Sequence, residues 1–180
     1  MSISSIAVIG AGTMGNGIAH VAAQSGFSVT LIDVSQGALD KALSTIAGNL
    51  DRQVKKEAIT AEDKDATLAR IATSTDLAAG VASADLVIEA ASENYDVKKS
   101  IFGVVDSACG ANTILATNTS SISITELAAT TSRADKVIGM HFFNPVPVMK
   151  LCEIIRGLAT SDETYATVKA MAETMGKVPV

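Results

Sequence analysis

The chain has 180 residues, of which 48% are apolar, 18% charged and 3% aromatic, and its net charge is −5. That length and apolar content allow one substantial hydrophobic core, so we expect a globular protein of one domain, or at most two. The acidic balance and the few aromatic rings exclude a generic nucleic-acid-binding protein, because such proteins neutralise phosphates with a basic surface and stack bases on aromatic side chains.

The apolar pattern also excludes a membrane-spanning protein. No unbroken apolar run approaches the roughly 18 residues that a spanning helix needs. The first lysine is Lys41, so we expect no secretory leader, which would begin with a basic stretch. Cys109 and Cys152 lie in apolar neighbourhoods and in no metal-ligand spacing. These features predict a cytoplasmic protein with two reduced core cysteines and no bound metal.

The first elements predict a βαβ unit. The unbroken apolar run at 6–9 is typical of a strand buried on both faces of a parallel sheet. From 13 to 24 apolar residues recur at helical spacing, and Gly26 ends the helix. A second strand is expected at 29–32 and ends at Asp33. A strand, a glycine turn, a helix and a strand in this order make a βαβ unit with a right-handed crossover.

The following segment, about 36–70, predicts a helical hairpin. Ser35 is suited to cap the first helix, whose apolar residues share one face, and a second helix is expected at 61–69. Residues 41–70 hold 11 of the 33 formally charged residues. We therefore expect the hairpin to project from the sheet into solvent, and a plain surface crossover is the alternative.

Strands and helices alternate through the rest of the chain. Strands are expected at 71–73, 86–89, 113–116, 136–140, 149–155 and 177–180, and helices at 96–108 and 162–175, with another beginning near Ile122. Such alternation predicts a single doubly wound α/β domain of the Rossmann type, with a mostly parallel sheet, over residues 1–180.

Residues 10–15, GAGTMG, form a GxGxxG loop that follows a predicted strand and begins a predicted helix. An acidic residue stands at the end of the second strand, as in dinucleotide-binding βαβ units. Gly10 permits the tight turn, Gly12 lets the backbone approach a pyrophosphate, and Gly15 allows close packing of helix on strand. Free N–H groups and the helix dipole then favour the phosphates. We predict dinucleotide contacts from Gly10, Ala11, Gly12, Thr13, Met14 and Gly15.

Asp33 stands 18 residues after Gly15, where a carboxylate can accept hydrogen bonds from both hydroxyls of the adenine ribose. The same charge repels a 2′-phosphate, and no arginine follows within the next several residues. The sequence therefore predicts NAD rather than NADP as the cofactor. The alternative is that Asp33 is only an acid at a helix N-terminus.

Two later segments place polar side chains at the carboxyl ends of predicted strands, where ligands bind in open α/β sheets. The first, at 118–121, reads Asn-Thr-Ser-Ser and offers an amide and hydroxyls to a ligand. Either Ser120 or Ser121 is also suited to cap the helix expected near Ile122.

The second segment opens at His141, continues through two prolines to residue 147 and is followed by Glu153, twelve residues after the histidine. A histidine can take a proton from an alcohol near neutral pH. A carboxylate that the next strand returns toward it would orient the ring and favour its charged form. The alternative is a hydrogen-bonded core histidine.

With these segments the chain resembles, from end to end, the 3-hydroxyacyl-CoA dehydrogenases, including their bacterial 3-hydroxybutyryl-CoA members. The resemblance rests on GAGTMG at 10–15, DLVIEA at 85–90 with Glu93-Asn94 and Lys98, NTSS at 118–121, and above all HFFNPVPVMKL at 141–151. It implies an NAD-binding Rossmann domain that acts on a coenzyme A thioester.

The resemblance also implies roles. His141 would take the 3-hydroxyl proton while C3 of the substrate gives its hydride to the nicotinamide, with Glu153 paired to the histidine and Ser120 bonded to the substrate oxygen. The other positions implied to lie near the cofactor are Ala90, Glu93, Lys98, Asn118, Ser120 and Asn144. In the family a serine and a lysine of the hairpin contact coenzyme A. The matching positions here are Asn49 and Lys56, so the serine is replaced by asparagine.

Family members continue for roughly another hundred residues as a helical domain, a typical two-domain size. That domain supplies dimer contacts, one wall of the substrate cleft and a catalytic asparagine. We therefore expect this chain to be the NAD-binding portion of a homodimeric enzyme, and to be weakly active or inactive alone.

The implied reaction interconverts (S)-3-hydroxyacyl-CoA, such as 3-hydroxybutyryl-CoA, and 3-oxoacyl-CoA, such as acetoacetyl-CoA, with NAD(H). Two alternatives remain open. One is a non-catalytic NAD-binding protein of the same fold, and the intact Ser120, His141 and Glu153 count against it. The other is a dehydrogenase of a free 3-hydroxy acid, which the run at 150–153 disfavours.

Overall fold

A computed structural model describes residues 3–180, and the predicted βαβ unit opens it. The unit consists of β1 (Ser5–Ile9), α1 (Thr13–Gln24) and β2 (Ser28–Ile32). β1 and β2 pair in parallel, with Ser5 opposite Ser28 and Ile9 opposite Ile32. Residues 6–9 are buried because helices cover both faces of the sheet. The expected bounds of all three elements are confirmed to within one residue.

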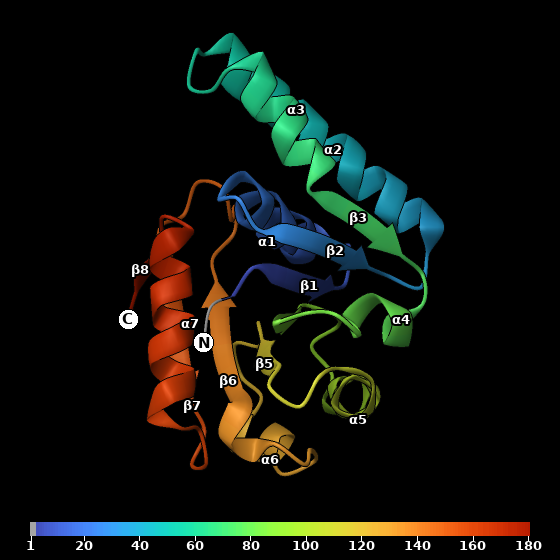
Figure 1. Ribbon diagram of the computed structural model, residues 1–180, viewed down its shortest axis with the longest axis vertical. Helices are drawn as coiled ribbons and strands as arrows, with labels where there is room; N and C mark the ends of the chain where they lie inside the picture. Colours follow the sequence, from blue (N-terminus) through green and yellow to red (C-terminus); the bar gives the residue numbers. More distant parts are fainter. Residues whose placement is uncertain (1–2) are drawn as a thin grey trace.

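The predicted hairpin is formed by α2 (Gln36–Lys55) and α3 (Ala61–Ala69), and Figure 1 shows the pair projecting beyond the sheet. Ser35 Oγ accepts a hydrogen bond from Ala38 N at 3.2 Å, which confirms the predicted cap. Thr60 and Asp63 form a capping box at the start of α3. The buried face of α2 packs toward α1 and consists of Leu39, Ala42, Ile46 and Leu50.

The remaining elements alternate as expected. They are β3 (Ile71–Ser74), α4 (Leu77–Val81), β4 (Leu86–Glu89), α5 (Tyr95–Ala108), β5 (Ile114–Thr117), α6 (Ile124–Ala128), a 3-10 turn (Ala134–Lys136), β6 (Val137–Phe142), β7 (Leu151–Arg156), α7 (Asp162–Thr174) and β8 (Val178–Pro179). The short helix α4 was not predicted. It is capped by Asp76, whose carboxylate accepts a hydrogen bond from Ala79 N at 3.0 Å.

The strands form one sheet in the order β3-β2-β1-β4-β5-β6-β7-β8. The six strands from β3 to β6 run parallel, and β7 is antiparallel to β6. The chain order reverses between β1 and β4, so a crevice lies at their carboxyl ends. The doubly wound, mostly parallel Rossmann sheet is therefore confirmed.

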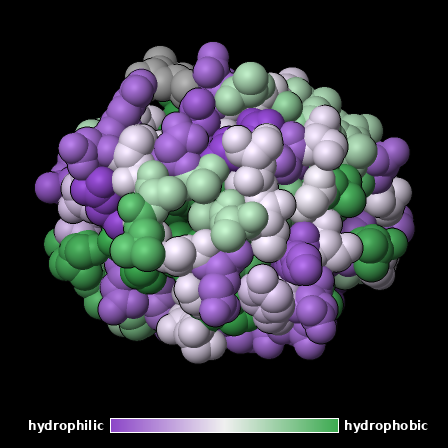
Figure 2. Space-filling view, turned by 90° about the horizontal axis from the view of Figure 1, so that it is seen from below, coloured by the Kyte–Doolittle hydropathy of each residue, from purple (hydrophilic) through white to green (hydrophobic). Residues whose placement is uncertain are grey.

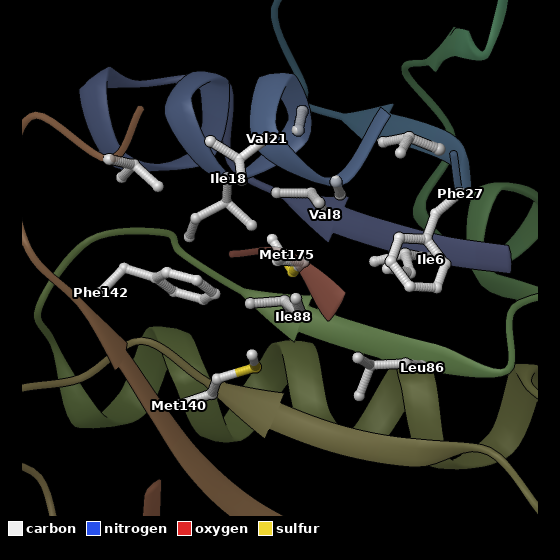
Figure 3. Packing of buried hydrophobic residues seen from close by; sticks show 14 of the residues in the cluster. Ile6, Val8, Ile18, Val21, Phe27, Leu86, Ile88, Met140, Phe142 and Met175 are labelled. Atoms are coloured by element: carbon white, nitrogen blue, oxygen red, sulfur yellow. The ribbon is translucent and has the colours of Figure 1, made fainter. Parts of the chain in front are cut away.

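The core lies on both faces of the sheet. On one face, side chains of β1, β4 and β6 meet α1, and Figure 3 shows Val8 and Ile88 near Ile18 of the helix, with Met140 and Phe142 beside them. A second cluster, under α4, α5 and α6, packs against the other face. Cys109 and Cys152 are buried free thiols.

Two boundaries differ from the predictions and bear on the site. β6 continues through Phe142, so His141 lies within a strand and not at the start of a loop, because it pairs across to β7. Helix α6 begins later than expected, and its cap is Ser123, whose Oγ accepts a hydrogen bond from Glu126 N at 3.2 Å. Neither Ser120 nor Ser121 is therefore used as a cap.

The surface carries no continuous apolar belt on the face seen in Figure 2, where apolar residues form separate patches among hydrophilic ones. Between residues 3 and 180, no helix is long and apolar enough to cross a membrane.

Candidate functional site

The glycine loop lies at the crevice between β1 and β4, and its three glycines differ in the space around them. Gly10 has a φ of +100°, and a Cβ there would lie 2.6 Å from the carbonyl oxygen of Ala90. A Cβ on Gly15 would lie 1.7 Å from the carbonyl oxygen of Gly10. A Cβ on Gly12, by contrast, would meet no other atom within 4 Å. The backbone is thus tight where helix meets strand and open where a ligand would approach.

The N-terminus of α1 is suited to an anion. Gly12 is the N-cap residue and forms no side-chain cap hydrogen bond. The first N–H groups of the helix and its dipole are therefore available to a phosphate. Ala11 is buried behind this turn, Met14 is half-buried and Thr13 is exposed.

Asp33 is tied to the glycine loop. One carboxylate oxygen accepts a hydrogen bond from Ala11 N at 2.8 Å, and the other accepts one from Ser35 N at 2.9 Å. Each oxygen retains a lone pair for a further donor. The carboxylate is half-buried at the carboxyl end of β2, beside the N-terminus of α1.

A cavity of about 760 Å³ lies beside these residues. Its polar lining includes Gly10, Gly12 and Asp33, and Ala90 also lies on its wall. The apolar part of the wall was not foreseen and includes Ile32, Val34, Leu77, Val97 and Ile101. A dinucleotide presents a flat apolar base next to a polar ribose and a pyrophosphate, so this lining and the open Gly12 fit such a ligand.

Lys98 was expected near the cofactor, but its side chain is buried in the sheet edge. Its Nζ lies 2.8 Å from each carboxylate oxygen of Glu89, and both side chains are 1% exposed. Glu89 also accepts hydrogen bonds from Ala91 N and Thr117 Oγ1, each at 2.7 Å. The pair therefore joins α5 to the ends of β4 and β5, beneath the crevice.

The loops after β4 and β5 and the end of β6 are joined by side chains that the sequence analysis singled out. Asn118 Oδ1 accepts a hydrogen bond from Phe142 N at 2.8 Å and so links the loop after β5 to β6. Glu93 accepts a hydrogen bond from Thr119 Oγ1 and thereby links the loop after β4 to the loop after β5. Ser120, next to this link, is exposed.

His141 and Glu153 face each other across the antiparallel strands β6 and β7. His141 Nδ1 lies 2.7 Å from Glu153 Oε2. Because the carboxylate requires a hydrogen on Nδ1, the neutral ring presents the lone pair of Nε2. The side chains are 19% and 44% exposed, so this pair is accessible, unlike Lys98 and Glu89.

Asn49 and Lys56 line a second cavity, of about 520 Å³, between α2 and the loop after β6. Arg52 lines it as well and donates a hydrogen bond to Asn49 Oδ1, although the sequence analysis did not single it out. The opposite wall is formed by Pro145, Pro147 and Val148. Asn144, which precedes that wall, is exposed.

Metal chemistry was not expected from the sequence. Over residues 3–180, no group of three or more His, Cys, Asp or Glu side chains is placed to hold a metal ion.

Comparison with known proteins gives a consistent result. Residues 5–180 match the family model described as 3-hydroxyacyl-CoA dehydrogenase, NAD binding domain. A 3-hydroxybutyryl-CoA dehydrogenase of Bradyrhizobium diazoefficiens is 50% identical over 97% of this chain and 59% of its own length. A 3-hydroxyadipyl-CoA dehydrogenase of Escherichia coli is 47% identical over the whole of this chain and 38% of its own.

The solved structures agree. The crystal structure of (S)-3-hydroxybutyryl-CoA dehydrogenase from Ralstonia eutropha superposes with a TM-score of 0.96 at 55% identity, and the match covers 99% of this chain and 63% of that one. The chain thus spans less than two thirds of the length of these relatives. The glycine loop, the crevice and these matches together establish that the chain belongs to the 3-hydroxyacyl-CoA dehydrogenase family and contains its NAD-binding domain.

Proposed function

We propose that this chain is the NAD-binding and proton-transferring part of a dehydrogenase that interconverts (S)-3-hydroxyacyl-CoA and 3-oxoacyl-CoA. The observation that carries the proposal is the contact of 2.7 Å between His141 Nδ1 and Glu153 Oε2, at the same sheet edge as the glycine loop. A histidine held in one tautomer and partly exposed is suited to take the proton that an alcohol releases on oxidation.

In the proposed mechanism His141 Nε2 accepts the proton of the 3-hydroxyl group as its carbon is oxidised, and returns a proton in the reverse direction. Glu153 orients the ring and stabilises the imidazolium that forms. Bound NAD supplies the acceptor for the hydride that leaves C3. Ser120, exposed at the end of β5, is proposed to hydrogen-bond the substrate oxygen and so to hold C3 in position.

The cofactor contacts are proposed to come from the glycine loop at 10–15, from Asp33 and from the strand-end residues. Ala90 lines the larger cavity, and Glu93, Asn118 and Asn144 lie on the loops or strand ends that border the crevice. For Lys98 we propose a structural role, because its ammonium is paired with the carboxylate of Glu89. This ion pair would stabilise the loops that contact the cofactor.

The coenzyme A moiety is proposed to lie in the second cavity, against Asn49 and Lys56. The cation of Lys56 and the amide of Asn49 suit the phosphates and amides of the ligand, and both residues line the cavity of about 520 Å³. We further propose that the whole enzyme is a cytoplasmic homodimer, by analogy with the family, and that the present chain is one of its domains.

A chimera tests this function. In it, residues 1–180 replace the matching part of the Bradyrhizobium diazoefficiens relative, and NADH oxidation is followed with acetoacetyl-CoA and with free acetoacetate. We expect turnover of the thioester, and we expect the 180-residue chain alone to bind NAD with weak turnover or none. A chimera that binds NAD but reduces neither compound would favour a non-catalytic protein, and preference for free acetoacetate would favour a dehydrogenase of a free hydroxy acid.

A further inference from the structure

Lys177, just after α7, is a buried cation that forms none of the ion pairs found within residues 3–180. Lys177 as a whole is only 7% exposed to solvent. Its Nζ donates hydrogen bonds to the carbonyl oxygen of Val146 and, at 2.8 Å, to that of Met149. Burial lowers the pKa of Lys177. Because a buried ammonium is costly unless it is hydrogen-bonded, these two carbonyls are what stabilises it.

The end of α7 places this side chain. Gly176 has a φ of +70°, and its N–H donates to Glu173 O at 2.9 Å. Lys177 N donates to Ala172 O at 3.0 Å, which completes a Schellman motif. The chain thereby reverses and enters β8, where Val178 N donates to Lys150 O at 2.8 Å. Lys177 thus lies against the segment at 143–150, which we call the proline loop.

The proline loop is held from several sides. Within it, Val148 N and Met149 N donate to Pro145 O at 3.0 and 2.9 Å. Val146 is buried against α1, where a Cβ on Gly17 would lie 2.8 Å from the Val146 Cβ. These contacts fix the loop locally and against α1, whereas the Lys177 ammonium joins it to the end of α7.

The proline loop connects the two parts of the candidate site. It begins directly after β6, which carries His141, and Pro145, Pro147 and Val148 form the wall of the cavity opposite Asn49 and Lys56. We infer that Lys177 is a positioning residue whose ammonium fixes the proline loop and thereby the wall against which coenzyme A would lie. The second part of this inference rests on the function proposed above.

Lys177→Met tests it, because methionine has a similar length and no donor. In the 180-residue chain we expect amide hydrogen exchange of Val148 and Met149 to accelerate about tenfold or more, while NAD affinity stays within about twofold. In the chimera the Kd for acetoacetyl-CoA should rise about tenfold, because a lost hydrogen bond to a charged group has that order of effect. Lys177→Arg, which keeps a cation with several donors, should restore most of both losses.

The outcomes separate this inference from the proposed function. If the unsubstituted chimera binds NAD but not acetoacetyl-CoA, the proposed function fails while hydrogen exchange still decides whether Lys177 fixes the loop. Unchanged exchange in Lys177→Met would overturn the inference, and so would equal losses of NAD and acyl-CoA affinity, which indicate only a general structural role.

A measurement on the unsubstituted chain covers the case in which Lys177→Met does not fold. With lysine labelled by ¹⁵N and carbonyls by ¹³C, we expect a slowly exchanging Lys177 ammonium with scalar couplings to the carbonyl carbons of Val146 and Met149. A rapidly exchanging ammonium without these couplings would refute the arrangement.

Discussion

Two pairs of a base and a carboxylate lie at the same edge of the sheet, and they differ in what remains free. In the Lys98–Glu89 pair, both side chains are 1% exposed, and the carboxylate has four hydrogen-bond contacts. In the His141–Glu153 pair, the contact of 2.7 Å occupies Nδ1 only, and the ring is partly exposed. A saturated buried pair can only support structure, whereas a pair with one free nitrogen can exchange a proton. We therefore expect the first pair to contribute stability, and we propose the second pair for proton transfer.

The largest effect is expected from removing the free nitrogen. His141→Gln in the chimera should lower kcat for acetoacetyl-CoA reduction by about 10²- to 10⁴-fold, since a general acid or base contributes that much. NAD affinity should change little, because the glycine loop and Asp33 are untouched. Steady-state kinetics and NAD titration check the two expectations.

Glu153→Gln is the matched control, since it keeps the ring and its hydrogen-bonded neighbour but removes the charge that stabilises the imidazolium. We expect a smaller loss of kcat than in His141→Gln. Near-normal turnover in His141→Gln would contradict the division between the two pairs.

The second effect concerns stability. Glu89→Gln leaves the Lys98 ammonium buried without its counter-charge, and removing one partner of a buried pair typically costs about 3–5 kcal/mol of unfolding free energy. Urea unfolding of the 180-residue chain measures this loss.

The double variant Glu89→Gln with Lys98→Met sharpens the test, because it removes both charges at once. It should recover much of the stability, as apolar replacements of buried ion pairs often do. A double variant less stable than Glu89→Gln alone would show that the role of Lys98 is not explained by its pairing with Glu89.

A third carboxylate, that of Asp33, is intermediate between those of Glu89 and Glu153. Two backbone N–H groups donate hydrogen bonds to it, yet the residue is only half-buried and can still contact a ligand. Asp33→Ala should weaken NAD binding and improve the relative affinity for NADP by about tenfold, since removing the charge removes its repulsion of a 2′-phosphate. Titration with both cofactors checks the ratio. A wild-type chain that binds the two equally would contradict this reading of Asp33.

Much of the fold around this site was predictable because its signals are local. The glycine loop with its helical apolar spacing predicted α1, and a short apolar run predicted β4, both with their observed bounds. Helix α4 was missed because five residues carry no helical period. The pairing of Lys98 with Glu89 was not foreseen, because a lysine on an amphipathic helix is normally solvated and Glu89 lies nine residues away on a strand. The approach of Glu153 to His141 was expected from the order of the two strands, whereas the contacts of Lys177 are set by tertiary packing and have no local signal.

The smallest expected effect comes from the second histidine, His20 on α1, which has no carboxylate partner among the residues at 3–180. The residue is fully buried, and its Nδ1 has no hydrogen-bond partner in the part of the chain that the structure describes. Burial lowers the pKa of His20, so the folded chain favours the neutral ring. The unfolded chain, with a histidine pKa of about 6.5, then binds more protons at lower pH.

The folded state should therefore lose stability as the pH falls below about 6.5, by at most about 1.4 kcal/mol per pH unit, until the lowered pKa of His20 is reached. Urea unfolding between pH 5 and 8 measures this slope, and the His141→Gln background isolates it because the chain has only two histidines. In that background His20→Gln should flatten the slope, since no histidine remains to titrate. A slope that persists unchanged without His20 would show that the pH dependence arises elsewhere.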